Sequence, residues 1–110
     1  MKKITSTQLA DKLKEHNVNV LDVRSEEKYA EQHITHSNAT CMNIPKTNIF
    51  NMNESGFTLP EPLTKETEIV ITCTTGNSAT KCATILSEHG YNVTVLDGGI
   101  TSWEKHTKKD

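Results

Sequence analysis

The chain has 110 residues, which is enough for one domain with a single sheet and flanking helices. Twelve basic and fourteen acidic residues give a net charge of −2. We therefore expect one domain over residues 1–110 that binds neither nucleic acid nor a membrane, because both partners select for a basic excess.

The first half of the chain alternates predicted strands with predicted helices. Its elements are a strand over 2–5, a helix from Thr5 to about His16, a buried strand over 18–23, one or two helical turns within 25–32, a strand over 39–44 and a short helix over 48–52. Thr5 and Gln8 match a capping box at the start of the first helix. Pro45 ends the predicted strand over 39–44.

The second half begins with the longest loop-like segment, residues 53–67, and segments of that length often cover a site. An apolar strand, a cysteine loop and a helix follow up to Gly90, then a strand over 92–96, a turn, a helix over 100–106 and a tail that we expect to fray. Strands alternate with helices throughout. The sequence therefore predicts an α/β fold with a mainly parallel sheet.

The segment from Glu68 to Gly90 carries the clearest chemical signal. Its strand holds the β-branched run Ile69, Val70 and Ile71, and its helix has an apolar stripe at Ala79, Cys82, Ala83 and Leu86. Cys73 would stand at the carboxyl end of this strand, where α/β sheets bind ligands, and would face the N-terminus of the helix. Helix N-termini stabilise anions, and Gly76 lets the loop turn its amides inward. We interpret Cys73 as a nucleophile in a cradle of backbone donors, with a buried packing residue as the alternative.

The other cysteines, Cys41 and Cys82, are expected to pack in a strand and in the core, although Cys41 could reach the site. The three cysteine spacings match no zinc pattern, so no metal is predicted. Free thiols, the lack of an apolar segment in MKKITSTQ and the lack of a long apolar run indicate a cytoplasmic protein.

Asp22 and Arg24 stand at the carboxyl end of the second strand. A charge at the end of an apolar strand must be paired or hydrated, so a structural link to a carboxylate or to the backbone is favoured over contact with substrate. Arg24 is the only arginine in the chain, which disfavours a phosphate-gripping site.

Four motifs stand in a set order: LDVR at 21–24, HI and NIP at 33–34 and 43–45, CTTGN at 73–77, and GYNVTVLDGGITSW at 90–103. Their order and separations resemble those of single-domain rhodaneses over roughly residues 3–106. The resemblance implies a rhodanese-like fold, in which a central five-stranded, mainly parallel sheet is flanked by helices.

The resemblance also implies roles for individual residues. Cys73 would be the nucleophile that takes a sulfane sulfur from thiosulfate, a polysulfide or a persulfide and passes it to a thiol or a carrier protein. The substrate-binding loop would comprise Thr74, Thr75, Gly76, Asn77 and Ser78, with Asp22 and Arg24 in support. No cofactor is implied. The partners would be a small sulfur-containing substrate or a sulfur-carrier protein, and family members of this size are monomers or homodimers.

The chain departs from the family at the end of the cysteine loop, where Ser78 stands in place of the usual arginine. Loss of a fixed cation is expected to weaken binding of a dianion such as thiosulfate, while Ser78 can serve as N-cap of the following helix. A non-catalytic rhodanese-like binding or redox-sensing module therefore stays open as the alternative. Phosphatase and arsenate reductase activities are disfavoured, because relatives with those activities have a longer loop closed by arginine.

Overall fold

The computed structural model describes residues 2–107, in which five strands form one parallel sheet. The strands are β1 Lys3–Ile4, β2 Val18–Asp22, β3 Ala39–Asn43, β4 Glu68–Thr72 and β5 Asn92–Leu96, in the spatial order β1-β5-β4-β2-β3. Every pairing is parallel, so the carboxyl ends of all strands lie at one edge of the sheet. The predicted α/β fold with a five-stranded, parallel sheet is confirmed.

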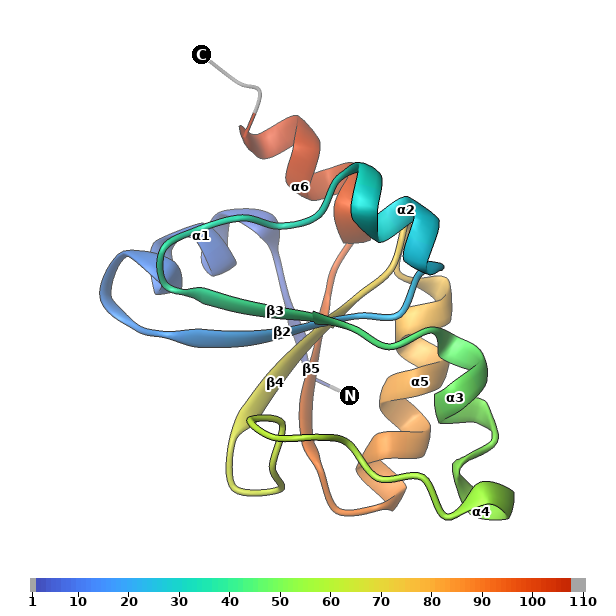
Figure 1. The fold of residues 1–110 in the computed structure, drawn as a ribbon. Coiled ribbons are helices and arrows are strands. Elements are labelled where there is room, and N and C mark those ends of the chain that lie inside the picture. The colour runs from blue at the N-terminus through green and yellow to red at the C-terminus, as the bar shows by residue number, and fades with distance from the viewer. Residues whose placement is uncertain (1, 108–110) are drawn as a thin grey trace.

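Helices cover both faces of the sheet (Figure 1). They are α1 Ser6–Glu15, α2 Glu26–Glu31, α3 Lys46–Phe50, α4 Met52–Ser55, α5 Asn77–Glu88 and α6 Gly99–Thr107. One apolar cluster joins α3, α4 and α5 to Ile69 and Ile71 of β4, and the other joins α1 and α6 to Val70. Because side chains of a strand point alternately to the two faces, the β-branched run of β4 fills both clusters.

The predicted start of the first helix and the predicted end of the cysteine-loop helix are confirmed, whereas the short helix predicted over 48–52 is in fact two helices, α3 and α4, with Asn51 between them. Thr5 is the N-cap of α1, and its side chain and that of Gln8 form the expected capping box. At the C-terminal end of α5, Gly90 has a φ of +92°, and the amide of Tyr91 donates to the carbonyl of Leu86 at 3.0 Å. These contacts satisfy helix carbonyls that would otherwise lack partners.

The segment over 53–67 differs from the expectation that it covers a site. It begins within α4, and Leu59 and Leu63 are buried in the cluster beneath α5. The segment leads into the first residue of β4, so it lies at the opposite edge of the sheet from Cys73. Its apolar side chains therefore close the core. The expected frayed tail falls mainly on residues 108–110, which lie outside the described part of the chain, and Thr107 ends α6.

No helix within residues 2–107 is long and apolar enough to cross a bilayer.

Glu68 ties the start of β4 to α1 and β5. Its carboxylate pairs with Lys12, accepts a hydrogen bond of 2.9 Å from the Thr94 hydroxyl and lies 3.8 Å from the Lys2 ammonium. The hydrogen bond from Lys12 is the main cause that holds the pKa of Glu68 below its usual range, against a smaller opposing effect of burial. The carboxylate is about a third exposed, so solvent screens the pair.

We expect Glu68→Gln to lower the free energy of unfolding at pH 7 by up to about 1 kcal/mol, the range for partly exposed ion pairs. Because the pKa of Glu68 is lower in the folded state, its contribution is present above the unfolded-state pKa and is lost as the pH falls through the folded-state pKa. Urea titrations at neutral and acid pH measure the free energy of unfolding of the parent protein and of the variant. Glu66→Gln, a substitution of an exposed glutamate, serves as control. A difference between Glu68→Gln and the parent protein that is the same at both pH values contradicts the assignment.

Candidate active site

Cys73 follows β4 directly and stands at the head of α5. Its sulfur accepts hydrogen bonds from the backbone amides of Gly76 at 3.0 Å and Ala79 at 3.3 Å. The sequence predicted a cysteine facing inward-turned amides at a helix N-terminus, and the structure has this geometry. A site of this kind stabilises an anionic sulfur, because both the amides and the helix dipole favour negative charge.

The start of α5 corrects one expectation. Gly76, with a φ of +106°, is the N-cap, and Ser78 lies within the first turn of the helix. The predicted N-cap role of Ser78 is therefore wrong. The physical reason is that the Cys73 sulfur already accepts a hydrogen bond from the amide of Ala79, as an N-cap side chain ordinarily does.

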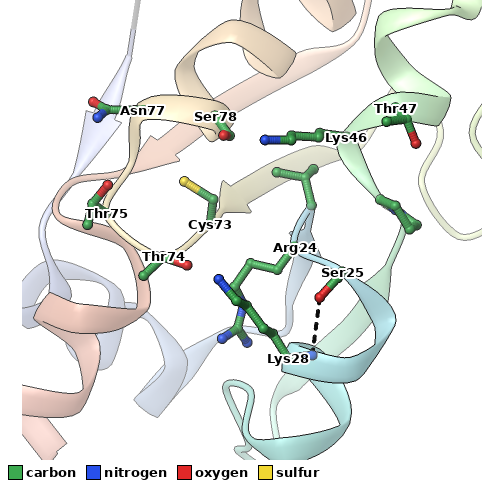
Figure 2. A pocket seen from close by; sticks show the side chains of 12 residues that line it. Arg24, Ser25, Lys28, Lys46, Thr47, Cys73, Thr74, Thr75, Asn77 and Ser78 are labelled. Carbon is green, nitrogen blue, oxygen red and sulfur yellow. Dashed lines mark hydrogen bonds between the residues drawn. The ribbon is translucent and has the colours of Figure 1, made fainter.

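A cavity of about 650 Å³ opens in front of Cys73 (Figure 2). Its lining residues are Val23, Arg24, Ser25, Lys28, Pro45, Lys46, Thr47, Cys73, Thr74, Thr75, Asn77 and Ser78. Cys73 as a residue is only 6% exposed, yet it is part of this lining. Of the predicted substrate-binding loop, Thr74, Thr75, Asn77 and Ser78 line the cavity, while Gly76 contributes its amide.

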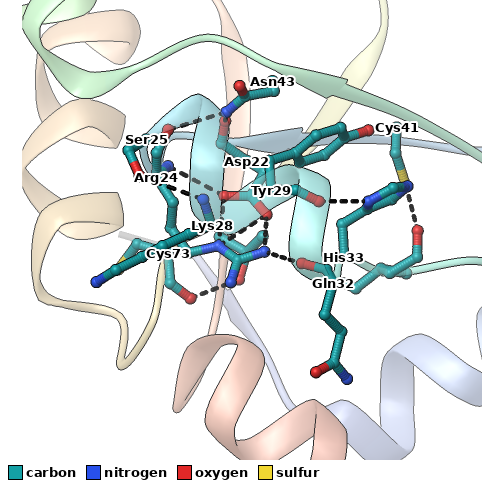
Figure 3. Close-up of polar contacts among 12 residues, drawn as sticks. Asp22, Arg24, Ser25, Lys28, Tyr29, Gln32, His33, Cys41, Asn43 and Cys73 are labelled. Carbon is teal, nitrogen blue, oxygen red and sulfur yellow. Dashed lines mark hydrogen bonds and ion pairs between the residues drawn. The ribbon is translucent and has the colours of Figure 1, made fainter.

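Asp22 and Arg24 form a buried pair at the end of β2 (Figure 3). The Arg24 guanidinium donates from Nη2 to Asp22 Oδ2 at 2.8 Å and from Nε to both carboxylate oxygens at 3.0 and 3.1 Å. Nη2 also donates to the carbonyl of Gln32 at 2.6 Å. The structure thus contains the Arg24–carboxylate link that the sequence favoured. Arg24 reaches the cavity wall with its charge largely balanced by Asp22.

The N-terminus of α6 holds the cysteine loop from behind, a contact that sequence reasoning missed. The amide of Ile100 donates to the Cys73 carbonyl at 2.8 Å, and that of Thr101 donates to the Thr74 carbonyl at 3.0 Å. A Cβ atom at Gly99 would lie 2.4 Å from the Cys73 carbonyl oxygen. The close approach therefore requires glycine, which explains the second glycine of the Asp97-Gly98-Gly99 turn.

Two lysines of the cavity wall were also missed. Lys28 lies on α2, which follows β2, and Lys46 begins α3, which follows β3. Neither lysine was assigned a part in the site from the sequence. The rule that ligands bind beyond the carboxyl ends of strands could have found both, because β2 and β3 are neighbours in the sheet.

The other two cysteines lie away from the cavity lining. The Cys41 thiol donates to the Ile34 carbonyl at 2.9 Å, and burial raises its pKa to about 11. Cys82 is fully buried on α5, and burial raises its pKa to about 12. Both thiols are free and pack as expected, and the possibility that Cys41 reaches the site is not realised. Within residues 2–107, no three His, Cys, Asp or Glu side chains gather where they could hold a metal ion.

Comparison with known proteins gives a family-model match, described as rhodanese-like domain, over residues 5–106. Among solved structures, a rhodanese-like domain protein from Staphylococcus aureus is 31% identical, with 94% of this chain and 91% of that chain covered and a TM-score of 0.72. The BH2092 protein from Bacillus halodurans is 31% identical, with 96% and 73% covered and a TM-score of 0.74. A rhodanese-related protein from Thermoplasma volcanium is 26% identical, with 96% and 93% covered and a TM-score of 0.71. No curated protein matches the chain.

We expect Gly99→Ala to displace the cysteine loop, because the added methyl would lie 2.4 Å from the Cys73 carbonyl oxygen and 2.7 Å from that of Thr74. Alkylation of Cys73 by iodoacetamide at pH 7 should slow about tenfold, since weakening one hydrogen bond to a charged group costs roughly 1.5 kcal/mol. Peptide mass spectrometry after timed quenching measures the rate at Cys73.

The matched control is Gly56→Ala. Gly56 also has a positive φ, of +73°, but a Cβ there would meet nothing within 4 Å. Both variants therefore carry similar backbone strain, and only one presses on the loop. A folded Gly99→Ala protein that is alkylated as fast as Gly56→Ala would remove the positioning role of this contact.

Proposed function

The chain belongs to the rhodanese-like domain family, and from that premise we propose that it is a sulfurtransferase or persulfide carrier that uses Cys73. One observation carries the proposal. The Cys73 sulfur accepts two amide hydrogen bonds at the head of α5 and stands in the wall of a cavity large enough for a small substrate.

The chemistry that we propose is exchange at sulfur. The Cys73 thiolate, its proton released to solvent, attacks the outer sulfur of the donor. A bond forms between the two sulfurs as the donor's own sulfur bond breaks, which releases sulfite from thiosulfate or a thiolate from an organic persulfide. An acceptor thiolate then attacks the outer sulfur of the Cys73 persulfide, and the Cys73 thiolate leaves. Each step moves one sulfur and needs no cofactor.

The cradle supports both anionic forms of the cysteine in this scheme. The amides of Gly76 and Ala79 already point at the sulfur, so they need no rearrangement when charge develops there. The Asp22–Arg24 ion pair lies at the end of β2, where Arg24 lines the cavity. The Asn43 side chain holds the same strand end, because it donates to the backbone carbonyls of Asp22 at 3.0 Å and Arg24 at 2.9 Å. We propose that this pair supports the cavity wall.

The wider setting is part of the same proposal. The partners would be a small sulfur-containing donor and a thiol or sulfur-carrier protein as acceptor. The protein would act in the cytoplasm as a monomer or homodimer, with residues 1–110 as one domain and no cofactor.

Incubation with thiosulfate or a polysulfide should add one sulfur, about 32 Da, to Cys73 as a persulfide. Intact-protein and peptide mass spectrometry measure the gain and its position. Cys73→Ser should gain no sulfur at that position, whereas Cys41→Ser should behave as the parent protein, because Cys41 lies outside the cavity lining. Sulfur uptake by Cys73→Ser at the parent rate would show that Cys73 is the wrong nucleophile.

A specific observation also favours a second candidate, a non-catalytic rhodanese-like module that binds a partner or senses redox state. Ser78 lines the cavity where the family usually has a cationic loop residue. A neutral hydroxyl there attracts a thiosulfate dianion far less than a guanidinium does.

Ser78→Arg separates the two candidates. For a sulfurtransferase, we expect the variant to raise thiosulfate:cyanide turnover several-fold, because a cation at the loop end stabilises the bound dianion. Ser78→Gln, a polar but neutral replacement, serves as control and should give no such rise. Absence of both turnover and persulfide in the parent protein and in Ser78→Arg would support the module.

A further inference from the structure

The cavity in front of Cys73 carries an unbalanced positive charge. Arg24, Lys28 and Lys46 are among the described residues that line it, and none of these lining residues is acidic. Asp22 balances Arg24. Within residues 2–107, neither lysine side chain has a hydrogen bond or an ion pair. A protein with a net charge of −2 thus keeps two unpaired cations at one cavity.

The two ammonium groups approach the cavity from different elements. Figure 2 shows Lys46 extending from α3 toward Ser78 and Cys73, while Lys28 extends from α2 on the other side of the cavity. Lys46 therefore points at the end of the cysteine loop, where the loop residue is Ser78 and its side chain is a neutral hydroxyl. The charge of Lys46 also acts on α5. Burial raises the pKa of Cys82, and the Lys46 ammonium has a smaller effect that lowers this pKa.

Two lysine ammonium groups can bind an anion without a fixed binding geometry. An ammonium is a compact point charge on a flexible stem, so it can follow an anionic group without the fixed geometry of a guanidinium. Two ammonium groups at a cavity whose lining holds no acidic residue favour a ligand with an anionic group, since the third cation of the lining, Arg24, is balanced by Asp22.

We propose that Lys46 and Lys28 form the anion-binding subsite of this cavity and supply from α3 and α2 the charge that the cysteine loop lacks. The subsite selects sulfur donors that carry an anionic group beside the transferred sulfur, either the sulfonate of thiosulfate or the carboxylate of an organic persulfide. This inference rests on the proposed function and names the substrate class and the residues that recognise it.

The test compares two donors with the same ethyl persulfide chain, 2-carboxyethyl persulfide, which ends in an anionic carboxylate, and 2-hydroxyethyl persulfide, which ends in a neutral hydroxyl, with thiosulfate as a third. In each persulfide reaction the Cys73 thiolate takes the outer sulfur with its hydrogen, and the organic thiolate leaves. The parent protein should prefer the carboxylated donor. The double variant Lys46→Met, Lys28→Met should reduce the ratio of kcat/KM for the carboxylated donor to kcat/KM for the hydroxylated donor about tenfold, the scale of two charge-assisted contacts at an exposed site.

Two controls separate the role of these lysines from a general effect of charge. Lys81→Met removes an exposed lysine of α5 that lies outside the cavity lining, and it should leave the donor ratio unchanged. Ser78→Arg added to Lys46→Met should restore thiosulfate KM, because the new guanidinium takes the place of the lost ammonium. A ratio that stays constant in the lysine variants, or a restoration that fails, overturns the proposal.

A binding measurement distinguishes this proposal from the proposed function. The Cys73→Ser protein lacks the thiol that would accept sulfur. Titration of this protein with thiosulfate, followed by the NMR chemical shifts of its backbone amides, therefore measures the Kd of the subsite alone. The lysine replacements should weaken its Kd about tenfold, as expected for loss of two cations. Weakened binding together with no sulfur transfer by the parent protein would retain the subsite and reject the sulfurtransferase. Sulfur transfer by the parent protein, together with a Kd that the lysine replacements leave unchanged, would retain the sulfurtransferase and reject the subsite.

Discussion

Two hydrogen bonds to one sulfur organise this end of the molecule. The amides of Gly76 and Ala79 donate to Cys73, and they can do so because β4 ends at Thr72 and α5 begins at Asn77. β4 pairs with β2 and with β5, so its end is held in place by neighbours on both sides. A sulfur anion there meets fixed donors and does not depend on mobile side chains.

The support for this arrangement comes from three directions. The apolar stripe of α5 packs onto the sheet, the amides of Ile100 and Thr101 hold the outward carbonyls of the loop, and the Asp22–Arg24 pair closes the neighbouring strand end. When the carbonyls of Cys73 and Thr74 are held on one side, the amides that follow are free to face the other. The loop is thus oriented through its backbone, and its side chains remain available to line the cavity.

The distribution of charge around the sulfur distinguishes this chain from the family pattern that it otherwise resembles. Ser78 leaves the loop neutral, and cations enter the cavity from α2 and α3. Flexible ammonium groups on separate helices can adapt to anions of different shape, whereas a guanidinium fixed in the loop favours one geometry.

The sequence alone determined the five strands, most of the helices and the nucleophile candidate, because those depend on local patterns. The Thr5–Gln8 capping box, the β-branched run of β4, the stripe of α5 and the cysteine before Gly76 each carry their signal within a few residues. Only the tertiary structure decided that the Cys73 sulfur replaces Ser78 as helix cap, that residues 53–67 lie far from the site, that Gly99 abuts the cysteine carbonyl, and that Lys28 and Lys46 face the same cavity. Those facts depend on which strand ends become neighbours, and contacts between residues distant in the chain leave no periodic trace in the sequence.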